Sequence, residues 1–174
     1  MNFQMNGALE ILERTPETLG SFLTGLSEGW LHCDEGMGTW SPAQVVDHLI
    51  ECEINNWIPR VKTILKADGD KSFPGFDRFA HITNPSNTAI EEKVKQFKQL
   101  RHQNCELVRE LIREDSQLEW KGEHPAFGEV KLRELLSTWV VHDFTHVSQI
   151  VRVMAERYRE DVGPWSEYLG VLRK

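Results

Sequence analysis

Cysteine is scarce in this sequence. The 174 residues include three cysteines, Cys33, Cys52 and Cys105, and no two of them form a CxxC pair. An odd, widely spaced set is not the pattern of a disulfide framework or of a zinc site built from cysteines. We therefore expect reduced thiols in a cytoplasmic protein, because disulfides persist mainly outside the cytoplasm.

An excess of basic residues is also missing. The chain has 20 Lys and Arg against 27 Asp and Glu, which gives a net charge of −7 with neutral histidines. Proteins that bind nucleic acid or anionic membranes usually present a basic surface. The charge balance therefore predicts neither a nucleic-acid partner nor a membrane partner.

Long apolar segments are absent as well. No apolar run approaches the roughly 20 residues that cross a membrane, and the N-terminal sequence MNFQMNGALE lacks the basic and apolar regions of a signal peptide. There is no strong alternating pattern to predict strands and no internal repeat. With 40% hydrophobic and 27% charged residues, the composition suits one domain, which we expect to span residues 1–174.

Helical periodicity is what the sequence does contain. Residues 3–14 indicate a first helix, and Thr15-Pro16 has the form of a helix cap followed by proline in the first turn. A helix should restart or kink there and continue to about Leu26. The glycine-containing segment 27–40 indicates a loop.

The clearest helix start is Ser41-Pro42, again a cap residue followed by proline. This helix should reach about Ala67, with a kink at Pro59. The loop 68–87 that follows is long, and ordered loops of about 20 residues are often functional. Its phenylalanines predict that it packs down on the bundle: Phe73, Phe76 and Phe79.

Two more long helices follow. Thr88 and Glu91 have the spacing of a capping box, which predicts a helix over about 88–113. Glycine and proline in 115–130 indicate a loop, and the last helix should cover about 131–159 before the C-terminal tail packs back. Four main helices separated by loops predict an all-α fold, a four-helix bundle.

Two histidines, His142 and His146, lie four residues apart on the last predicted helix. Residues at this spacing project from one face, so both imidazoles can reach one point. The apolar stripe of the helix passes through both positions on its way from Leu135 to Ile150. Buried imidazoles need partners for their ring nitrogens, and a shared metal ion satisfies one nitrogen of each. A core hydrogen-bonded through polar neighbours such as Gln149 is the alternative.

A third ligand is expected from another helix, and His48 is the best candidate. It lies on the apolar side of the helix that begins at Ser41-Pro42. Three histidines without a fourth protein ligand are typical of a metal site with a position open to water or substrate. Such a centre would lower the pKa of a bound water or activate a thiolate.

Residues next to these histidines could complete the site. Cys52 follows His48 by one helical turn and could be a ligand, although a small buried thiol is the simpler interpretation. Carboxylates that could orient the imidazoles are near in sequence, and surface roles are the alternative for each: Asp47, Glu51 and Asp143.

The other histidines carry less weight. His32 and His81 fall in predicted loops, and His102 lies in a polar run of the third helix. His124, followed by Pro125, precedes the last helix, from where it could approach the site; a turn explains the His-Pro pair equally well.

At this point the sequence resembles a known family, the DinB-like superfamily of DinB and YfiT-type bacterial proteins. The resemblance rests on LERTPETL (12–19), TWSPAQVVDHLIECE (39–53), HPAFGEVKLRELLSTWVVHDFTHVSQIVRVMAERY (124–158) and GPWSEYLGVL (163–172). Its strongest part is the pairing of WSPxxVxxHL with WVVHDxxHxxQ. The resemblance implies an up-down-down-up bundle with a divalent metal ion on His48, His142 and His146.

The resemblance also implies what such a centre does. Members with assigned activities include thiol-dependent S-transferases and isomerases that use thiols such as bacillithiol, mycothiol or glutathione, and known members are often dimers. We therefore expect a homodimeric metalloenzyme with a small-molecule substrate, either an S-transferase that acts on a low-molecular-weight thiol or a hydrolase. Zinc or nickel is the expected ion, with iron and manganese as alternatives. A non-catalytic binding or stress-response module stabilised by its metal is the competing hypothesis.

Overall fold

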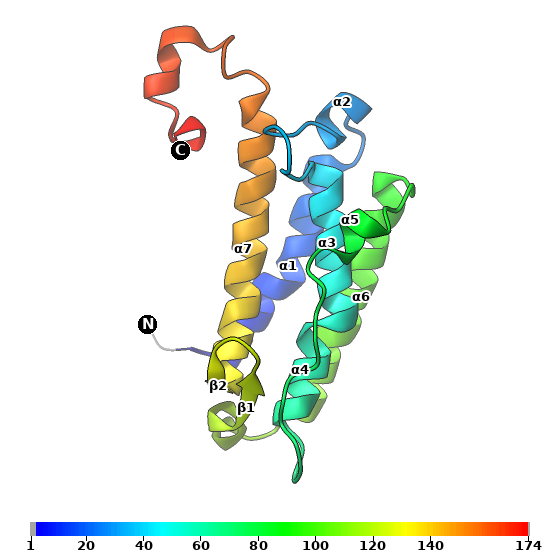
Figure 1. The fold of residues 1–174 in the computed structure, drawn as a ribbon, viewed down its shortest axis with the longest axis vertical. Coiled ribbons are helices and arrows are strands. Elements are labelled where there is room, and N and C mark those ends of the chain that lie inside the picture. Colours follow the sequence, from blue (N-terminus) through cyan, green and yellow to red (C-terminus); the bar gives the residue numbers. More distant parts are fainter. Residues whose placement is uncertain (1–2, 174) are drawn as a thin grey trace.

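The long helices form a bundle, as predicted, in a computed structural model that describes residues 3–173 (Figure 1). They are α1 (Met5–Leu23), α3 (Pro42–Asn55) with its continuation α4 (Trp57–Ile64), α6 (Ile90–Leu111) and α7 (Leu132–Glu156). Helices α1 and α7 run in one direction and α3, α4 and α6 in the other, which is the up-down-down-up arrangement (Figure 1). Helix α1 contacts both α6 and α7, and so does α3.

A single domain over 1–174 stays a prediction, and its ends, residues 1–2 and 174, lie outside the described residues. Across the described chain, the helices are all too short or too polar to span a lipid bilayer.

Helix α1 passes through Pro16, so of the two predicted alternatives, a restart or a continuation with a kink, the restart is wrong. Proline lacks the N–H that would bond to the carbonyl of Leu12, one turn earlier. That carbonyl accepts a hydrogen bond from Nη1 of Arg101 on α6, at 2.7 Å. The helix continues because a neighbouring helix supplies the donor that proline removes.

The helix start at Ser41 is confirmed. Its hydroxyl accepts from the backbone N–H of Gln44, and the Gln44 side chain accepts from the backbone N–H of Ser41 at 2.9 Å, which forms a capping box. The kink expected from Pro59 appears three residues earlier, because α3 and α4 separate at Asn56. A proline disturbs the turn that precedes it, so the break falls upstream of the ring.

Helix α6 begins at Ile90, and its cap residue Ala89 offers no side chain to the first turn. The capping box predicted for Thr88 and Glu91 is therefore wrong. The backbone N–H of Thr88 instead donates to the hydroxyl of Ser86. A capping motif gives the spacing of a helix start, and the preceding loop decides whether the cap residue reaches the helix.

Small elements occupy the predicted loops. They are α2 (Glu28–Leu31), α5 (Ala80–Thr83), the 3₁₀ turns η1 (Asp115–Glu119), η2 (Gly163–Glu167) and η3 (Gly170–Leu172), and the strands β1 (Lys121–His124) and β2 (Gly128–Lys131). The strands pair as an antiparallel hairpin. The sequence did not predict this hairpin, since strands of four residues are too short to show a clear alternation.

The hairpin fixes the long loop 68–87. The backbone N–H of Phe73 donates to the carbonyl of Glu123 at 2.9 Å, and the N–H of Glu123 donates to the carbonyl of Lys71 at 2.9 Å. Gly122 permits this approach, because a Cβ there would lie 2.5 Å from the Phe73 ring. Phe73 is buried and Phe76 is half-buried, which confirms that the loop packs down, while Phe79 stays exposed. The C-terminal tail packs back through Leu172, whose carbonyl accepts from Arg159.

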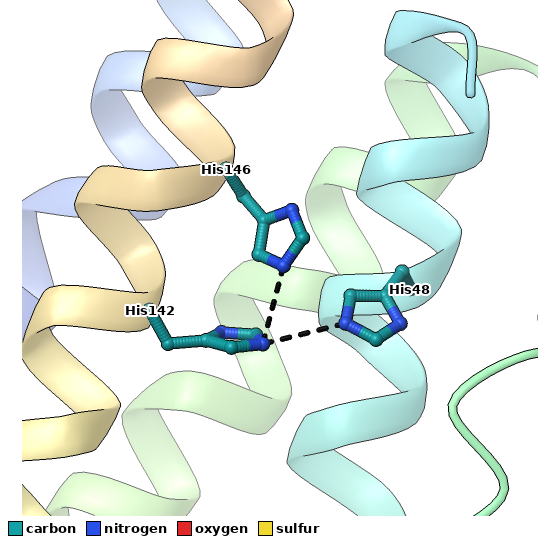
Figure 2. Close-up of side chains that lie close together, drawn as sticks. All are labelled: His48, His142 and His146. Carbon is teal, nitrogen blue, oxygen red and sulfur yellow. Dashed lines mark hydrogen bonds between the residues drawn. The ribbon is translucent and has the colours of Figure 1, made fainter. Parts of the chain in front are cut away.

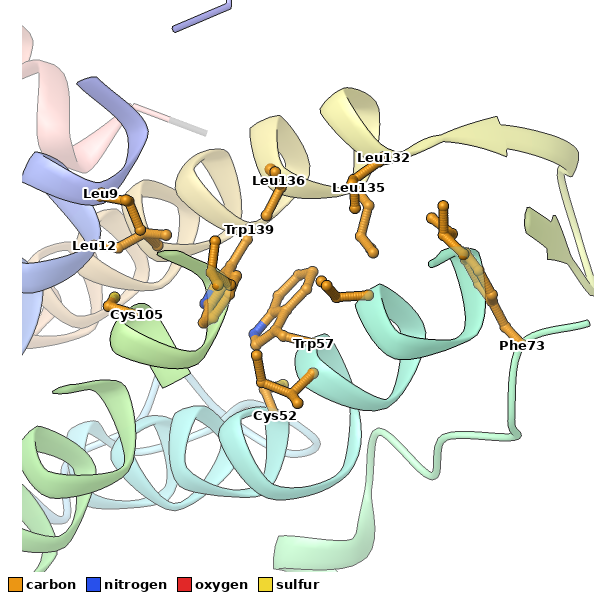
Figure 3. Close-up of a cluster of buried hydrophobic side chains, with 14 residues drawn as sticks. Leu9, Leu12, Cys52, Trp57, Phe73, Cys105, Leu132, Leu135, Leu136 and Trp139 are labelled. Atoms are coloured by element: carbon orange, nitrogen blue, oxygen red, sulfur yellow. The ribbon is translucent and has the colours of Figure 1, made fainter. Parts of the chain in front are cut away.

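The core consists of two apolar clusters along the bundle. One surrounds Trp57 and Trp139, whose rings stack with centroids 5.4 Å apart (Figure 3). The other surrounds Leu49, Phe97 and Ile150 near the opposite end of the helices. On α3 and α7 the two clusters meet near the predicted ligand positions.

A charged cluster is buried between the helices, and we call it the arginine cluster: Arg101, Glu53, Asp143, Asn104 and Trp139. Arg101 is 1% exposed, and its guanidinium donates two hydrogen bonds to Asp143, at 2.6 and 2.9 Å, and one to Glu53 at 2.9 Å. Asn104 and the Trp139 indole also donate to Glu53. Together with the bond to the Leu12 carbonyl, these contacts join α1, α3, α6 and α7.

Candidate metal centre

The three predicted histidines come together in the bundle interior. His48 projects from α3 toward His142 and His146 on α7 (Figure 2). Nε2 of His142 lies 3.3 Å from Nε2 of His48 and 3.2 Å from Nε2 of His146. One ring nitrogen from each residue lies within 4.8 Å of the others, a spacing at which they could hold one metal ion. We call this group the three-histidine centre.

Helical spacing and packing produce this arrangement. His142 and His146 continue the buried stripe of α7 between Trp139 and Ile150, so both face the bundle interior. His48 follows the same rule on α3, one turn before the buried Cys52. The centre therefore lies where the two apolar clusters meet.

Burial keeps the imidazoles neutral. Desolvation, helped by the neighbouring histidines, lowers the pKa of His48 to about 3 and that of His142 to about 2. Desolvation also lowers the pKa of His146, although its bond to Gln149 acts in the opposite direction. Neutral imidazole is the form that binds metal, so near pH 7 all three rings are ready to act as ligands.

The outer ring nitrogens differ in how they are held. Nδ1 of His146 lies 2.8 Å from the amide oxygen of Gln149, which fixes the proton on Nδ1 and turns the Nε2 lone pair toward the centre. Nδ1 of His142 is buried and has no hydrogen-bond partner within residues 3–173. Nδ1 of His48 is buried too, and the backbone of Arg78 lies close enough to His48 to act on its pKa in the direction opposite to burial, without forming a hydrogen bond of good geometry.

The nearby carboxylates have other partners. Asp47 pairs with Lys93 at 2.6 Å, and Asp143 belongs to the arginine cluster. Glu51 accepts from the side chain of Asn55. The structure thus assigns these three acids to ion pairs and local bonds, and it gives the orienting role to Gln149.

The donor set fits a divalent ion. Three neutral nitrogens from two helices converge, and Nε2 of His142 contacts Nε2 of both other histidines. A neutral imidazole carries only one N–H, so a single proton on Nε2 of His142 could not serve both contacts, whereas a metal ion could bind all three nitrogens. Cys52 lies beside them, with Sγ 3.4 Å from Nε2 of His48 and 3.9 Å from Nε2 of His142. Burial raises the pKa of the Cys52 thiol, so it stays protonated near pH 7, in keeping with a small buried thiol.

His81 is the histidine that the sequence undervalued. Its ring is 5% exposed and packs edge-on against Trp40, with centroids 4.3 Å apart, and lies 5.1 Å from the ring of His48. Desolvation lowers its pKa to about 4, and neither ring nitrogen has a partner in the described chain. No local pattern could have revealed this position, because the long loop brings it there. His102 is exposed, as predicted, and His32 pairs with Glu28.

A pocket of about 900 Å³ opens onto the centre. All three histidines line it, and Trp40 covers one side, with its ring 6.1 Å from that of His146 and nearly parallel to it. The loop 68–87 forms part of the wall, and His124 also lines the pocket, as its predicted approach to the site requires. The aromatic part of the wall comprises Trp57, Phe73, Phe76, Phe79 and Phe127.

Comparison with known proteins agrees with this fold. The model of the DinB superfamily matches residues 11–150. YfiT from Bacillus subtilis, a solved structure described as a probable metal-dependent hydrolase with an unusual four-helix bundle topology, superimposes with a TM-score of 0.73. The alignment covers 88% of this chain and 87% of YfiT at 21% sequence identity, so the likeness shows a shared fold. No curated protein matches the chain significantly.

Proposed function

Because this chain belongs to the DinB superfamily, we propose that it is a metal-dependent hydrolase with one divalent ion on His48, His142 and His146. The observation that carries the proposal is the convergence of three neutral imidazole nitrogens at a pocket large enough for a small molecule. The description of YfiT as a probable metal-dependent hydrolase supports the same chemistry.

Each side chain around the centre has a definable task. When bound, the ion would act as a Lewis acid that activates water or polarises a carbonyl. Gln149 holds the proton on Nδ1 of His146, so that Nε2 remains free to bind. Trp40 and Trp57 cover His146 and His142 and limit the access of bulk water to the rings.

Metal analysis tests the first half of this proposal. Protein purified without a histidine tag should carry about one equivalent of a divalent ion, with zinc or nickel expected and iron or manganese as alternatives. His102→Ala, a change at an exposed histidine on α6, should leave the metal content unchanged. An unchanged metal content in His142→Ala would count against the three-histidine centre.

Hydrolysis assays test the second half. Protein loaded with zinc, nickel, manganese or iron should cleave activated esters or amides, and His48→Ala should abolish that turnover. Absence of turnover with every ion and every ester or amide would remove the hydrolase assignment and leave the metal site standing.

Thiol transfer is a second candidate chemistry. Three neutral ligands leave the charge of a divalent ion uncompensated, which favours binding of a thiolate. Consumption of a low-molecular-weight thiol with chlorodinitrobenzene as the electrophile would support it. If His142→Ala only melts at a lower temperature and no activity is found to lose, the non-catalytic module is favoured instead.

We also propose a homodimer in the cytoplasm. Helix α7 exposes apolar side chains at spacings of three and seven residues along its outer face: Val141, Phe144 and Val151. Phe144 is 52% exposed, and Phe144→Glu should convert a dimer to a monomer in light-scattering measurements. All three cysteines are free, which suits a reducing compartment.

A further inference from the structure

The pocket differs in charge from the protein around it. The chain has a net charge of −7, yet the charged residues that line the pocket are Arg60, Arg78, Arg152 and Glu134. Arg152 is neutralised by Glu35, which accepts three hydrogen bonds from its guanidinium. Glu134 accepts from the backbone N–H of Lys131 at the start of α7. Glu134 keeps its negative charge, and Arg60 and Arg78 outnumber it, so the cavity is net positive.

Arg60 is the more buried of these two. Its guanidinium lies over the ring of Phe73, 5.4 Å from the centroid, and its Nε is enclosed without a hydrogen-bond partner in the described part of the chain. Desolvation lowers its pKa, and no carboxylate of the described residues is among the groups that act on that pKa. A desolvated guanidinium without an acid is costly to the fold unless a ligand supplies the anion.

Further unused polar groups lie next to Arg60. Asn56 is one helical turn before it, is 5% exposed, and its amide oxygen accepts no hydrogen bond from the described residues. The indole N–H of Trp57 is also without a partner there. The Trp57 ring contacts His142, with centroids 5.1 Å apart. The unused polar atoms of Asn56, Trp57 and Arg60, one acceptor and two donors, therefore lie on α4 and at its start, next to the three-histidine centre.

The remaining wall of the pocket is largely apolar. Phe73, Phe76 and Leu135 present hydrocarbon surface beside the arginine. A guanidinium matches a planar carboxylate through two parallel hydrogen bonds. A doubly charged phosphate would need more donors than one half-buried arginine and its amide neighbour provide.

We propose that Arg60 binds the carboxylate of an amphipathic substrate, whose apolar body lies against Phe73 and Phe76 and whose reactive bond faces the three-histidine centre. The position of the reactive bond rests on the proposed hydrolase function. The carboxylate site itself stands on the pocket alone. Asn56 completes it by donating from its amide, because the amide nitrogen and oxygen can exchange places by rotation.

Binding of matched probes tests this site without requiring turnover. Titration calorimetry on the full chain, both as purified and after treatment with EDTA, would compare 4-phenylbutyrate with its neutral amide and with phenyl phosphate. We expect the carboxylate to bind roughly tenfold or more tightly than the amide in both forms. Equal affinity for carboxylate and amide, or tighter binding of phenyl phosphate, would overturn the proposal.

Substitutions then locate the site. Arg60→Met should weaken 4-phenylbutyrate binding by about tenfold or more and leave binding of the amide nearly unchanged. Arg60→Lys, which keeps the charge and loses the planar fork, should lose less. The matched control Arg78→Met removes a positive charge from an exposed residue on the same pocket and should cost less than Arg60→Met.

The outcomes separate this site from the proposed function. Carboxylate selectivity that disappears in Arg60→Met supports the site even when no metal binds and no ester is cleaved. Metal binding and hydrolysis without carboxylate selectivity overturn the site alone. An equal loss in Arg60→Met and Arg78→Met also overturns it, because general charge would then explain the binding. Unchanged melting temperatures of both variants show that the differences arise from binding.

Discussion

The arginine cluster and the three-histidine centre lie side by side, and they differ in how fully their buried polar atoms are hydrogen-bonded. Asp143 of the cluster directly follows His142 of the centre, and Glu53 directly follows Cys52. In the cluster, Asp143 and Glu53 both accept from Arg101, and only Nε of Arg101 has no partner among the described residues. In the centre, Nδ1 of His48 and Nδ1 of His142 are without one.

This difference separates a structural polar network from a functional one. Native proteins satisfy nearly all buried polar atoms, so a group of unsatisfied ones indicates a place where something else binds. In the arginine cluster every charged group has an opposite charge beside it, and only Nε of Arg101 lacks a hydrogen-bond partner among the described residues, so the cluster holds the helices together. The three-histidine centre leaves two outer Nδ1 atoms without a partner, and its three Nε2 atoms converge beside a pocket, where an ion could bind them.

Acid should lower the free energy of unfolding mainly through the histidines of the three-histidine centre. The folded pKa values of His48 and His142, about 3 and about 2, lie below the value near 6.5 of an unfolded chain. Below pH 6.5 the unfolded state therefore takes up protons that the folded state does not. Each of the two histidines should lower the free energy of unfolding by about 1.4 kcal/mol per pH unit as the pH falls toward its folded pKa.

Urea denaturation of the metal-free protein at several pH values between 6.5 and 4.5 would measure this slope. His142→Ala should reduce the slope by about one proton, whatever its absolute stability. If the variant and the parent show the same slope, His142 does not remain neutral in the folded state.

Removing the central guanidinium should destabilise the protein through the arginine cluster. Arg101→Met leaves Glu53 and Asp143 buried without a counter-charge, and the expected loss is about 3–5 kcal/mol of unfolding free energy. Arg109→Met, eight residues along α6 at an exposed ion pair, should cost less than about 1 kcal/mol. Urea denaturation of both variants measures these losses, and similar losses of unfolding free energy in the two variants would contradict a special role for Arg101.

Removing one ligand should affect binding far more than folding. His142→Ala should weaken zinc affinity by about 100-fold or more, since even partners outside the ligand set contribute 10–100-fold. In metal-free protein the same change removes a buried group with an unsatisfied nitrogen, so it should cost less stability than Arg101→Met. Calorimetric zinc titration measures the first effect and denaturation the second. His102→Ala is the matched control for both.

The smallest expected effect concerns His146, the histidine whose ring Gln149 orients. Gln149→Leu removes the acceptor that fixes the proton of His146, and zinc affinity should fall by about tenfold. Gln149→Glu keeps an acceptor and should retain most of the affinity. Zinc titrations of the two variants that give equal losses would show that Gln149 does not orient the ring.

The sequence predicted what helical periodicity can encode. The apolar stripe of α7 and the well-capped start of α3 placed His48, His142 and His146 on facing sides of a bundle, and the structure brings them together. It did not predict His81, Arg60 or the bond from Arg101 to Leu12. Each of these depends on contacts between segments far apart in the chain, which no local spacing records.

Capping motifs show the same limit on a smaller scale. Ser41 and Thr88 both stand where a cap is expected, yet only Ser41 bonds to its helix. Pro16 likewise suggested a restart that Arg101 prevents. Local rules therefore give the main helices of the bundle, while tertiary contacts determine where these helices begin and whether they are interrupted.

The bond from Arg101 to the Leu12 carbonyl has a consequence for how the chain acquires its structure. The middle of α1 is completed by a residue on α6, and the same guanidinium also needs partners on α3 and α7. Of these helices, α7 is the last to leave the ribosome, so Arg101 can pair with Glu53 but not with Asp143 until synthesis of the bundle is nearly finished. We therefore expect the contact with Asp143 to form late on the folding path, so that weakening it accelerates unfolding more than it slows folding.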